Sequence, residues 1–322
     1  MITRIVYPSA LEYWLKEKGL PYRYWDVGKP TPPEEKKTGR ASITEIVKQL
    51  TFTPPVHVAV PRKINRHNTT IVTFHTLPKH LPENSFIQIT DRILISSPEM
   101  CFLQAARILP FHMLVKLACE LCAIYVFDPY EEYGQRHREP ITTISNIGDF
   151  LQRAKGISGV QLASQAIQYA SDRANSPMEV NLATIAVLPI SFGGFGVKKM
   201  LLNYDVPLTE AGAAHLGRNV CCCDMVWLEK KVVLEYDSNL SHLNRQQHAK
   251  DKARITALSL SGYKVISVTA DNLRNYRKIE ELFLMIRRAL GMRTHKDRME
   301  KNYDKRTHVV NSIMFPSVKI IW

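Results

Sequence analysis

The sequence lacks several features that define large classes of proteins. It has no run of about 18 uncharged apolar residues, so we expect no transmembrane helix. Its six cysteines are too few for a disulfide scaffold in 322 residues. The stretch MITRIVYPSALEYWLKEKG has no apolar signal-peptide core before its charges resume. We therefore expect a cytoplasmic protein without a membrane partner. The apolar share of 45% excludes a mainly disordered chain.

Acidic residues are scarce relative to basic ones. The chain has 30 Asp and Glu against 43 Lys and Arg, which gives a net charge of +13. From Lys250 onward there are 16 basic and 7 acidic residues, so +9 of this excess lies in that part. Such an excess favours a polyanionic partner, with nucleic acid ahead of an acidic membrane. A solvated basic surface without a specific partner is the alternative.

The first half of the chain has the pattern of an α+β domain. Alternating or β-branched residues predict strands at 56–60, 69–74 and 86–89. Ser97 followed by Pro98 predicts the start of a helix, because serine caps helices and proline fits their first turn. Further helical segments follow, and we place a domain boundary after residue 172.

The second half begins with a clear helix signal. Ser176 and Pro177 are followed by Glu179, which lies three places after the capping serine and predicts a capping box. Two strands then surround a predicted two-residue turn, Glu229-Lys230. The elements expected after Ser176 are a helix at 179–188, strands at 197–204, 219–228 and 231–237, a helix at 244–260, a strand at 263–268 and a helix at 272–290.

The predicted hairpin brings acidic residues together. If Leu228 pairs with Lys231, Asp224 lies opposite Glu235 and Cys222 lies opposite Asp237. Strand alternation adds Val226 and Val233 to this acidic face. The other face should then be apolar and pack on the core: Cys221, Cys223, Met225, Trp227, Val232, Leu234 and Tyr236.

Carboxylates that converge in a half-buried place repel one another. A divalent cation with hard oxygen ligands, Mg²⁺ or Mn²⁺, would resolve this repulsion through Asp224, Glu235 and Asp237. A solvated sheet edge is the alternative. A zinc site of Cys222, Asp224 and His242 is a further one.

Polar residues beyond the hairpin could assist chemistry on a phosphate. His242 could act as general acid or base, or simply form a loop hydrogen bond. Lys252 or Arg254 could contact the phosphate. A solvated helix face for Lys252, and an Asp251–Arg254 pair within the helix, are the alternatives.

The C-terminal segment mixes basic residues with Tyr303. It could follow a DNA backbone through Arg293, Lys296 and Arg298, or be a solvated extension.

The stretch 176–272 resembles a known family. Its pieces SPMEVNLATIAVL, CCCDMVWLEKKVVLEYDSNLSH, DKARITAL and SGYKVISVT are similar to the very-short-patch-repair-endonuclease-like branch of the restriction-endonuclease (PD-(D/E)xK) superfamily. The resemblance implies a metal-dependent nuclease core. It also implies that Asp224 is the first-strand acid, Glu235 and Asp237 the Glu-x-Asp pair, Glu179 the helix acid and His242 the histidine after the acidic strand. A capping box explains Glu179 equally well.

The chain departs from this pattern at two positions. Asp237 replaces the lysine that usually follows the glutamate, as is common in this branch, and Ser238 stands where glycine is usual. In the first part, VHVAVPRK, VTFHTLP and ILISSPEMCFLQAA are more weakly similar to AbiEi-like antitoxin regulators.

These patterns lead to one overall prediction. We expect an α/β protein with an AbiEi-like α+β domain at 1–172, a restriction-endonuclease-like domain at 173–290 and a basic tail at 291–322. The second domain would be a Mg²⁺- or Mn²⁺-dependent DNA endonuclease or nickase. The alternative is a non-catalytic DNA-binding regulator of an abortive-infection or toxin–antitoxin system.

Overall fold

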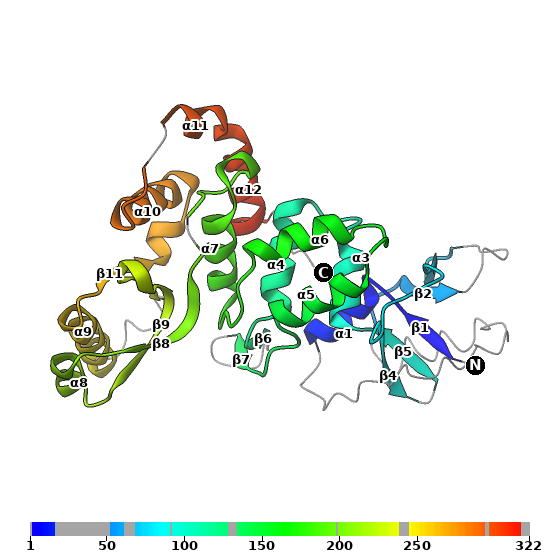
Figure 1. Cartoon of the computed structure of the whole chain (residues 1–322), viewed down its shortest axis with the longest axis horizontal. Coiled ribbons are helices and arrows are strands. Elements are labelled where there is room, and N and C mark those ends of the chain that lie inside the picture. The colour runs from blue at the N-terminus through cyan, green and yellow to red at the C-terminus, as the bar shows by residue number, and fades with distance from the viewer. Residues whose placement is uncertain are drawn as a thin grey trace. The chain divides into compact units, whose positions relative to one another are not determined.

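The computed structural model describes residues 2–16, 52–60, 68–90, 92–127, 134–197, 199–237, 245–293 and 296–316. The chain is a mixed α/β protein (Figure 1). It divides into two compact units between Gln168 and Tyr169. Within the described residues, no helix is long and apolar enough to cross a lipid bilayer.

The first unit is built on a five-stranded mixed sheet in the order β3-β2-β1-β5-β4. The central strand β1 pairs in parallel with β5 and antiparallel with β2, which pairs in parallel with β3. The predicted strand at 56–60 is confirmed, whereas β1 and β5 were not predicted. The strands are β1 (Thr3–Ile5), β2 (Val56–Val60), β3 (Val72–Thr76), β4 (Phe86–Thr90) and β5 (Ile93–Ser96).

Helices beside this sheet complete the first unit. Ser97 caps α3 as predicted, because its Oγ accepts a hydrogen bond from the backbone N–H of Met100 at 3.2 Å. Buried Trp14 ties α1 to the sheet by donating from Nε1 to the carbonyl of Ser96 at 2.7 Å. The remaining elements are α1 (Ser9–Lys16), α3 (Pro98–Ala105), α4 (Phe111–Leu121), β6 (Tyr125–Phe127), β7 (Gln135–His137), α5 (Ile144–Arg153), α6 (Val160–Ala166) and the 3₁₀ helix η1 (Ile167–Tyr169).

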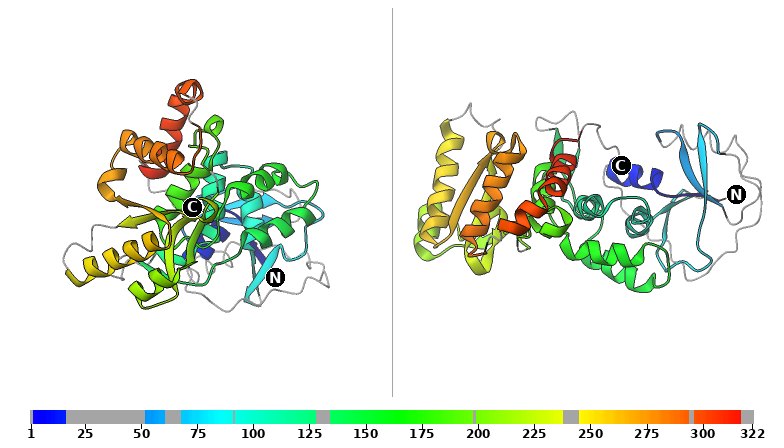
Figure 2. Two further views of the ribbon diagram at one scale, coloured as in Figure 1. Left: turned by 60° about the vertical axis from the view of Figure 1, so that its left-hand side comes forward. Right: turned by 90° about the horizontal axis from the view of Figure 1, so that it is seen from above.

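The second unit is built on a four-stranded mixed sheet in the order β11-β10-β9-β8. Neighbouring strands β8, β9 and β10 are antiparallel, whereas β11 runs parallel to β10. The helices α9 and α10 lie on either side of these strands (Figure 2). The strands are β8 (Leu201–Pro207), β9 (Val220–Trp227), β10 (Val232–Asp237) and β11 (Lys264–Thr269).

The three predicted helices of this unit are present in the predicted order as α7, α9 and α10, and α8, α11 and α12 were not predicted. The short helix α8 lies between β8 and β9, where none was predicted. It packs on the end of α9 so closely that a Cβ at Gly212 would lie 2.4 Å from Ser261 Oγ. The helical elements are α7 (Pro177–Val187), η2 (Ile190–Phe192), α8 (Glu210–Leu216), η3 (Leu228–Lys230), α9 (Arg245–Leu260), η5 (Ala270–Leu273), α10 (Tyr276–Ala289), α11 (Lys296–Lys301) and α12 (Tyr303–Met314).

The described part of the C-terminal segment, residues 296–316, packs into the second unit and is not a solvated extension. Helix α12 contacts α7 and η2. At Gly193, φ is +87° and a Cβ would lie 2.7 Å from Val309 Cγ2, so only glycine fits beside this helix. Arg306, 1% exposed, donates to Tyr276 Oη at 2.8 Å and to Glu280 Oε1 at 2.8 Å.

The hairpin of β9 and β10 has the predicted register but not the predicted turn. Val232 pairs with Trp227 and Leu234 with Met225, as the sequence indicated. The connection is the 3₁₀ turn η3 followed by Lys231 at φ +49°, rather than a two-residue turn at Glu229-Lys230. The longer connection preserves the register because it starts one residue earlier and ends one residue later than the predicted turn.

Candidate functional site

The centre of the site is the point where the β9–β10 ladder stops. Asp224 and Glu235 are the next residues along the two strands after the last pair, Met225 with Leu234. Asp224 Oδ2 accepts a hydrogen bond from the backbone N–H of Tyr236 at 2.8 Å. The Asp224 carboxylate therefore accepts a backbone N–H hydrogen bond of the kind that a main-chain carbonyl accepts in a regular antiparallel ladder.

Helix α9 supplies the positive charge of the site. Arg254 Nη2 donates to Glu235 Oε2 at 3.0 Å and to the carbonyl of Cys222 at 2.8 Å. The side chains of Arg254 and Glu235 are 31% and 16% exposed. The other carboxylate oxygen of Glu235, Oε1, is buried without a hydrogen-bond partner of regular geometry in the described part of the chain, and the nearby Cys223 thiol favours the charged form of this carboxylate. Glu235 thus has one paired and one unsatisfied oxygen.

Helix α7 brings a third carboxylate to the site through its N-terminal cap. The serine half of the predicted capping box is present, because Ser176 Oγ accepts from Glu179 N at 3.2 Å. The Glu179 carboxylate accepts in return from Ser176 Oγ at 2.9 Å and from Asn175 N at 2.8 Å. Its Oε2 also accepts from Asn203 Nδ2 on β8 at 2.5 Å. The hydrogen bond from Asn203 connects the start of α7 to strand β8 of the sheet.

Asn203 is a residue of the site that the sequence did not indicate. Its φ is +45°, a left-handed conformation that asparagine adopts more readily than most residues. It lies between the Leu202–Met225 and Tyr204–Cys223 pairs, at the level of Asp224. Its Nδ2 also donates to the carbonyl of Arg173 at 2.8 Å. No spacing or motif distinguishes this asparagine in the sequence.

The three carboxylates affect one another electrostatically. Burial, followed by the charge of Asp224, raises the pKa of Glu179 to about 7. The same two causes, in the same order, raise the pKa of Glu235 to about 8, although Arg254 opposes them. Burial also raises the pKa of Asp224, against the Tyr236 N–H and Arg254. At neutral pH the site therefore holds protons that exposed carboxylates would have lost.

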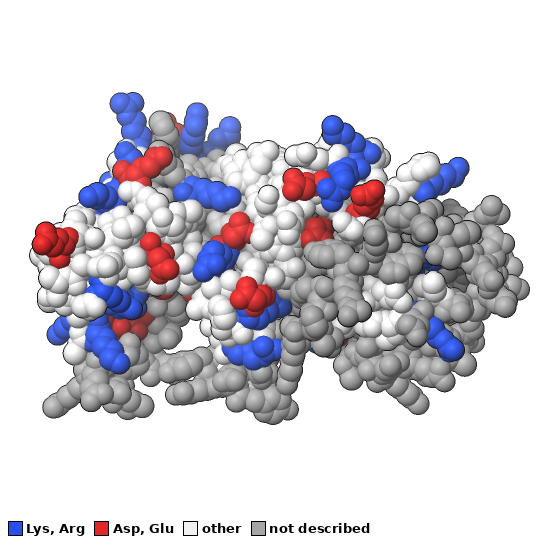
Figure 3. Space-filling view, turned by 60° about the horizontal axis from the view of Figure 1, so that its bottom comes forward, with Lys and Arg blue, Asp and Glu red and all other residues white. Residues whose placement is uncertain are grey.

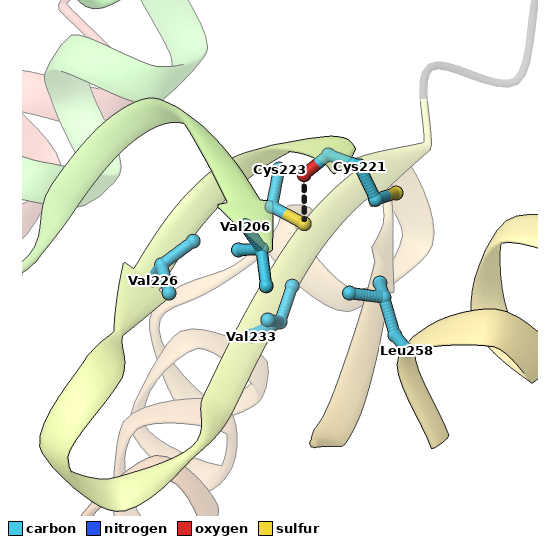
Figure 4. Packing of buried hydrophobic residues seen from close by; sticks show 6 residues of the cluster. All are labelled: Val206, Cys221, Cys223, Val226, Val233 and Leu258. Atoms are coloured by element: carbon cyan, nitrogen blue, oxygen red, sulfur yellow. Dashed lines mark hydrogen bonds between the residues drawn. The ribbon is translucent and has the colours of Figure 1, made fainter. Parts of the chain in front are cut away.

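The apolar cluster beside the acids corrects the predicted faces of β9. Cys221 and Cys223 pack with Val226, Val233 and further residues (Figure 4), whereas regular alternation would put the cysteines on the opposite face. The pleat changes sides at Asp224. The prediction that Cys221 and Cys223 lie on the face opposite to Val226 and Val233 is therefore wrong. The cluster consists of Val206, Cys221, Cys223, Val226, Val233 and Leu258.

The remaining predicted residues are not gathered at this point. Asp237 is half-buried at the end of β10, beside Thr269 of β11. Lys252 is exposed on α9, and the ion pair of Arg254 is with Glu235 rather than within its own helix. Arg293 and Arg298 are exposed. His242 and the side chain of Lys296 lie outside the described residues.

The oxygen donors of Asp224 and Glu235 suit a hard divalent cation. One of these oxygens, Glu235 Oε1, is buried and unsatisfied, as an oxygen that awaits a cation would be. In the described ranges, no three His, Cys, Asp or Glu side chains form a group that could hold a metal ion. Mg²⁺ typically takes one or two protein carboxylates and completes its shell with water and substrate phosphate. Asp224 and Glu235 fit that pattern as a pair.

Comparisons of the chain with models of protein families, with curated proteins and with solved structures find no match.

Proposed function

We propose that the second unit is a metal-dependent nuclease that hydrolyses phosphodiester bonds in DNA. The observation that carries the proposal is the pair Asp224–Glu235, two half-buried carboxylates at the end of a strand ladder, one with a buried and unsatisfied oxygen. Buried like charges are costly unless something compensates them. A functional metal site is the most direct reason to keep them together.

The order of elements supports this proposal. Helix α7, strands β8, β9 and β10, helix α9 and strand β11 follow one another as in the restriction-endonuclease-like core that the sequence resembles. The acids of this family would lie on β9 and β10 and at the start of α7, where Asp224, Glu235 and Glu179 lie here. Helix α8 is an addition to that core.

In this proposal, Asp224 and Glu235 hold Mg²⁺ or Mn²⁺. The bound cation would supply an activated water and offset the charge that develops on the phosphate. The Tyr236 N–H orients Asp224, and Asn203 and Ser176 orient Glu179. These contacts fix the acids before substrate arrives, which reduces the reorganisation that catalysis would otherwise require.

The charge of the chain supports DNA as the substrate class. The net charge is +13, and most of the excess follows Lys250. On the face drawn in Figure 3, coloured Lys and Arg side chains are interspersed with Asp and Glu rather than joined in one patch. We therefore assign DNA contact to separate residues that follow Lys250 in the chain, with Arg293, Lys296 and Arg298 among them.

The test is cleavage of supercoiled plasmid by the intact chain with Mg²⁺ or Mn²⁺. Asp224→Asn and Glu235→Gln should each reduce the nicking rate at least about a hundredfold, because each removes a cation ligand. Glu281→Gln is the matched control, since Glu281 is an exposed carboxylate on α10 that pairs with Lys278 at 3.1 Å. It should retain the full rate.

Two results would contradict the nuclease proposal. One is the absence of metal-dependent cutting on single-stranded, duplex and supercoiled DNA. The other is cutting that Glu235→Gln and Glu281→Gln reduce equally.

One observation favours the alternative, a DNA-binding regulator without catalysis. Arg254 already pairs with Glu235 at 3.0 Å, so the site can persist without a metal ion. A regulator would shift DNA on a gel equally in EDTA and in Mg²⁺. It would also show no metal uptake by calorimetry.

A further inference from the structure

Arg254 occupies the position beside Glu235 that a metal ion would share. Its Nη2 is 3.0 Å from Glu235 Oε2, and the same nitrogen is held by the carbonyl of Cys222 at 2.8 Å. Asp224 is close enough for its charge to act on both residues. A guanidinium in this place repels a divalent cation that approaches the same two carboxylates.

We propose that Arg254 is a displaceable internal counter-ion that competes with the metal for Glu235. The inference rests on the proposed nuclease function and deepens it. In the absence of substrate, Arg254 stays paired with Glu235 and weakens metal binding. A phosphate of the DNA draws Arg254 away from Glu235, and the metal then binds more tightly. Arg254 is in this sense a positioning residue, which acts through Glu235.

The geometry allows this displacement. The ion pair with Glu235 uses a single nitrogen of the guanidinium, Nη2, whereas arginine binds phosphate best with two parallel hydrogen bonds. The side chain of Arg254 is 31% exposed, so an anion from solvent can reach it. Its position in the middle of α9 anchors the backbone while the long side chain changes partner.

The exchange also gives the unsatisfied oxygen a role. Glu235 Oε1 has no hydrogen-bond partner of regular geometry in the described residues while Arg254 holds Oε2. A metal ion would satisfy an oxygen that the arginine leaves unsatisfied. Glu235 therefore has two states, one paired with Arg254 and one bound to the metal ion. Because the DNA phosphate and the metal ion both favour the second state, each strengthens the binding of the other by the same factor.

The experiment measures Mn²⁺ affinity without DNA, by electron paramagnetic resonance of free Mn²⁺. Arg254→Gln and Arg254→Met should bind Mn²⁺ about tenfold more tightly than the unmodified chain, because the competing charge is gone. Arg254→Lys keeps the charge and should resemble the unmodified chain. The matched control is Arg277→Gln, an exposed arginine on α10, which changes the net charge equally.

A second measurement tests the part played by phosphate. Ca²⁺ should strengthen binding of a short duplex severalfold in the unmodified chain and in Arg277→Gln, and less in Arg254→Gln. If Ca²⁺ increased duplex affinity equally in all three proteins, the proposed transfer of Arg254 from Glu235 to phosphate would be wrong.

The outcomes separate this inference from the nuclease proposal. If Arg254→Gln and Arg254→Met bind Mn²⁺ no more tightly than Arg277→Gln, Arg254 is not a competing counter-ion and the inference is wrong. If no variant and no unmodified protein binds Mn²⁺, the metal site itself is wrong, and the proposed function fails with it.

Discussion

Asp224 is the residue on which the electrostatics of the site depends. It raises the pKa of both Glu179 and Glu235, while its own carboxylate accepts the Tyr236 N–H. The hydrogen bond requires only an oxygen acceptor, whereas the repulsion requires the negative charge. An amide at this position would therefore keep the first interaction and remove the second.

We expect Asp224→Asn to stabilise the protein at pH 8 by about 1 kcal/mol, because the repulsion with the two glutamates disappears. At pH 5 the glutamates are protonated in the folded state, so the gain should be smaller. Urea unfolding at both pH values measures the difference. A variant that is less stable than the unmodified chain at pH 8 would refute this account of Asp224.

The sequence predicted part of this site and missed another part for physical reasons. Alternation and pairing placed Asp224 beside Glu235 because both depend on residues close together in the chain. The ion pair of Arg254 with Glu235 depends on how α9 packs, which the sequence pattern does not encode. Asn203 escaped prediction because its left-handed conformation has no signal beyond the residue type.

At the scale of elements, β9 shows how one irregular position changes which residues share a face. The expectation of a purely apolar second face assumed unbroken alternation through Asp224. The structure instead puts Cys221 and Cys223 with Val226 and Val233 (Figure 4). Consequently the acids lie at the edge of a packed core rather than on a polar surface, and this explains their burial.

Local signals predicted the elements better than the connections between them. The caps at Ser97 and Ser176 were recognisable because a serine and a proline act on the next turn of the chain. Gly262, at φ +82°, follows α9 as predicted. Helix α8 and strand β1 are short, and their formation depends on packing against distant segments.

Helix α12 should contribute strongly to the stability of the second unit. Arg306 is buried, pairs with Glu280 and lies over the ring of Phe195 at 5.7 Å. Arg306→Ala should lower the free energy of unfolding by about 3 kcal/mol, because it leaves polar groups unpaired and opens a cavity.

The measurement is the urea midpoint of the second unit. Lys301→Ala, at an exposed position of α11, is the control and should change stability by less than about 0.5 kcal/mol. Equal effects of the two substitutions would show that the Arg306 contacts contribute little.

At the scale of the whole molecule, His57 of the first unit and the carboxylates of the second unit should contribute to the pH dependence of stability in opposite directions. In the first unit, His57 Nδ1 and His75 Nε2 lie 2.7 Å apart. Burial, and then the neighbouring His75, lower the pKa of His57 to about 4. The unfolded chain therefore binds more protons than the folded unit between about pH 6.5 and 4, and stability falls as the pH falls.

The second unit has the reverse dependence. The raised pKa values of Glu179 and Glu235, about 7 and about 8, mean that the folded unit holds protons that the unfolded chain loses above about pH 4.5. Its stability should therefore fall as the pH rises from about 4.5 to about 8.

Buried thiols can report on each unit separately. Cys101, Cys119 and Cys122 are buried in the first unit, and Cys221 and Cys223 in the second. Urea titrations at pH 5 and pH 8, each followed by a short pulse of a thiosulfonate reagent and mass spectrometry, give two unfolding midpoints. The first unit's midpoint should be higher at pH 8 and the second unit's higher at pH 5. If the urea midpoints of both units shifted in the same direction between pH 5 and pH 8, this account of their pH dependence would be contradicted.

The contact of α12 with α7 has a consequence for the order in which the protein is made. Glu179 stands at the start of α7, yet α7 packs on a helix synthesised much later. Domains generally fold from the N-terminal side as the chain emerges. The first unit can fold while the ribosome is still translating, whereas α7, which carries Glu179, gains its contact with α12 only after α12 has emerged. In a nascent chain the helix that positions Glu179 would therefore be packed incompletely until α12 is made.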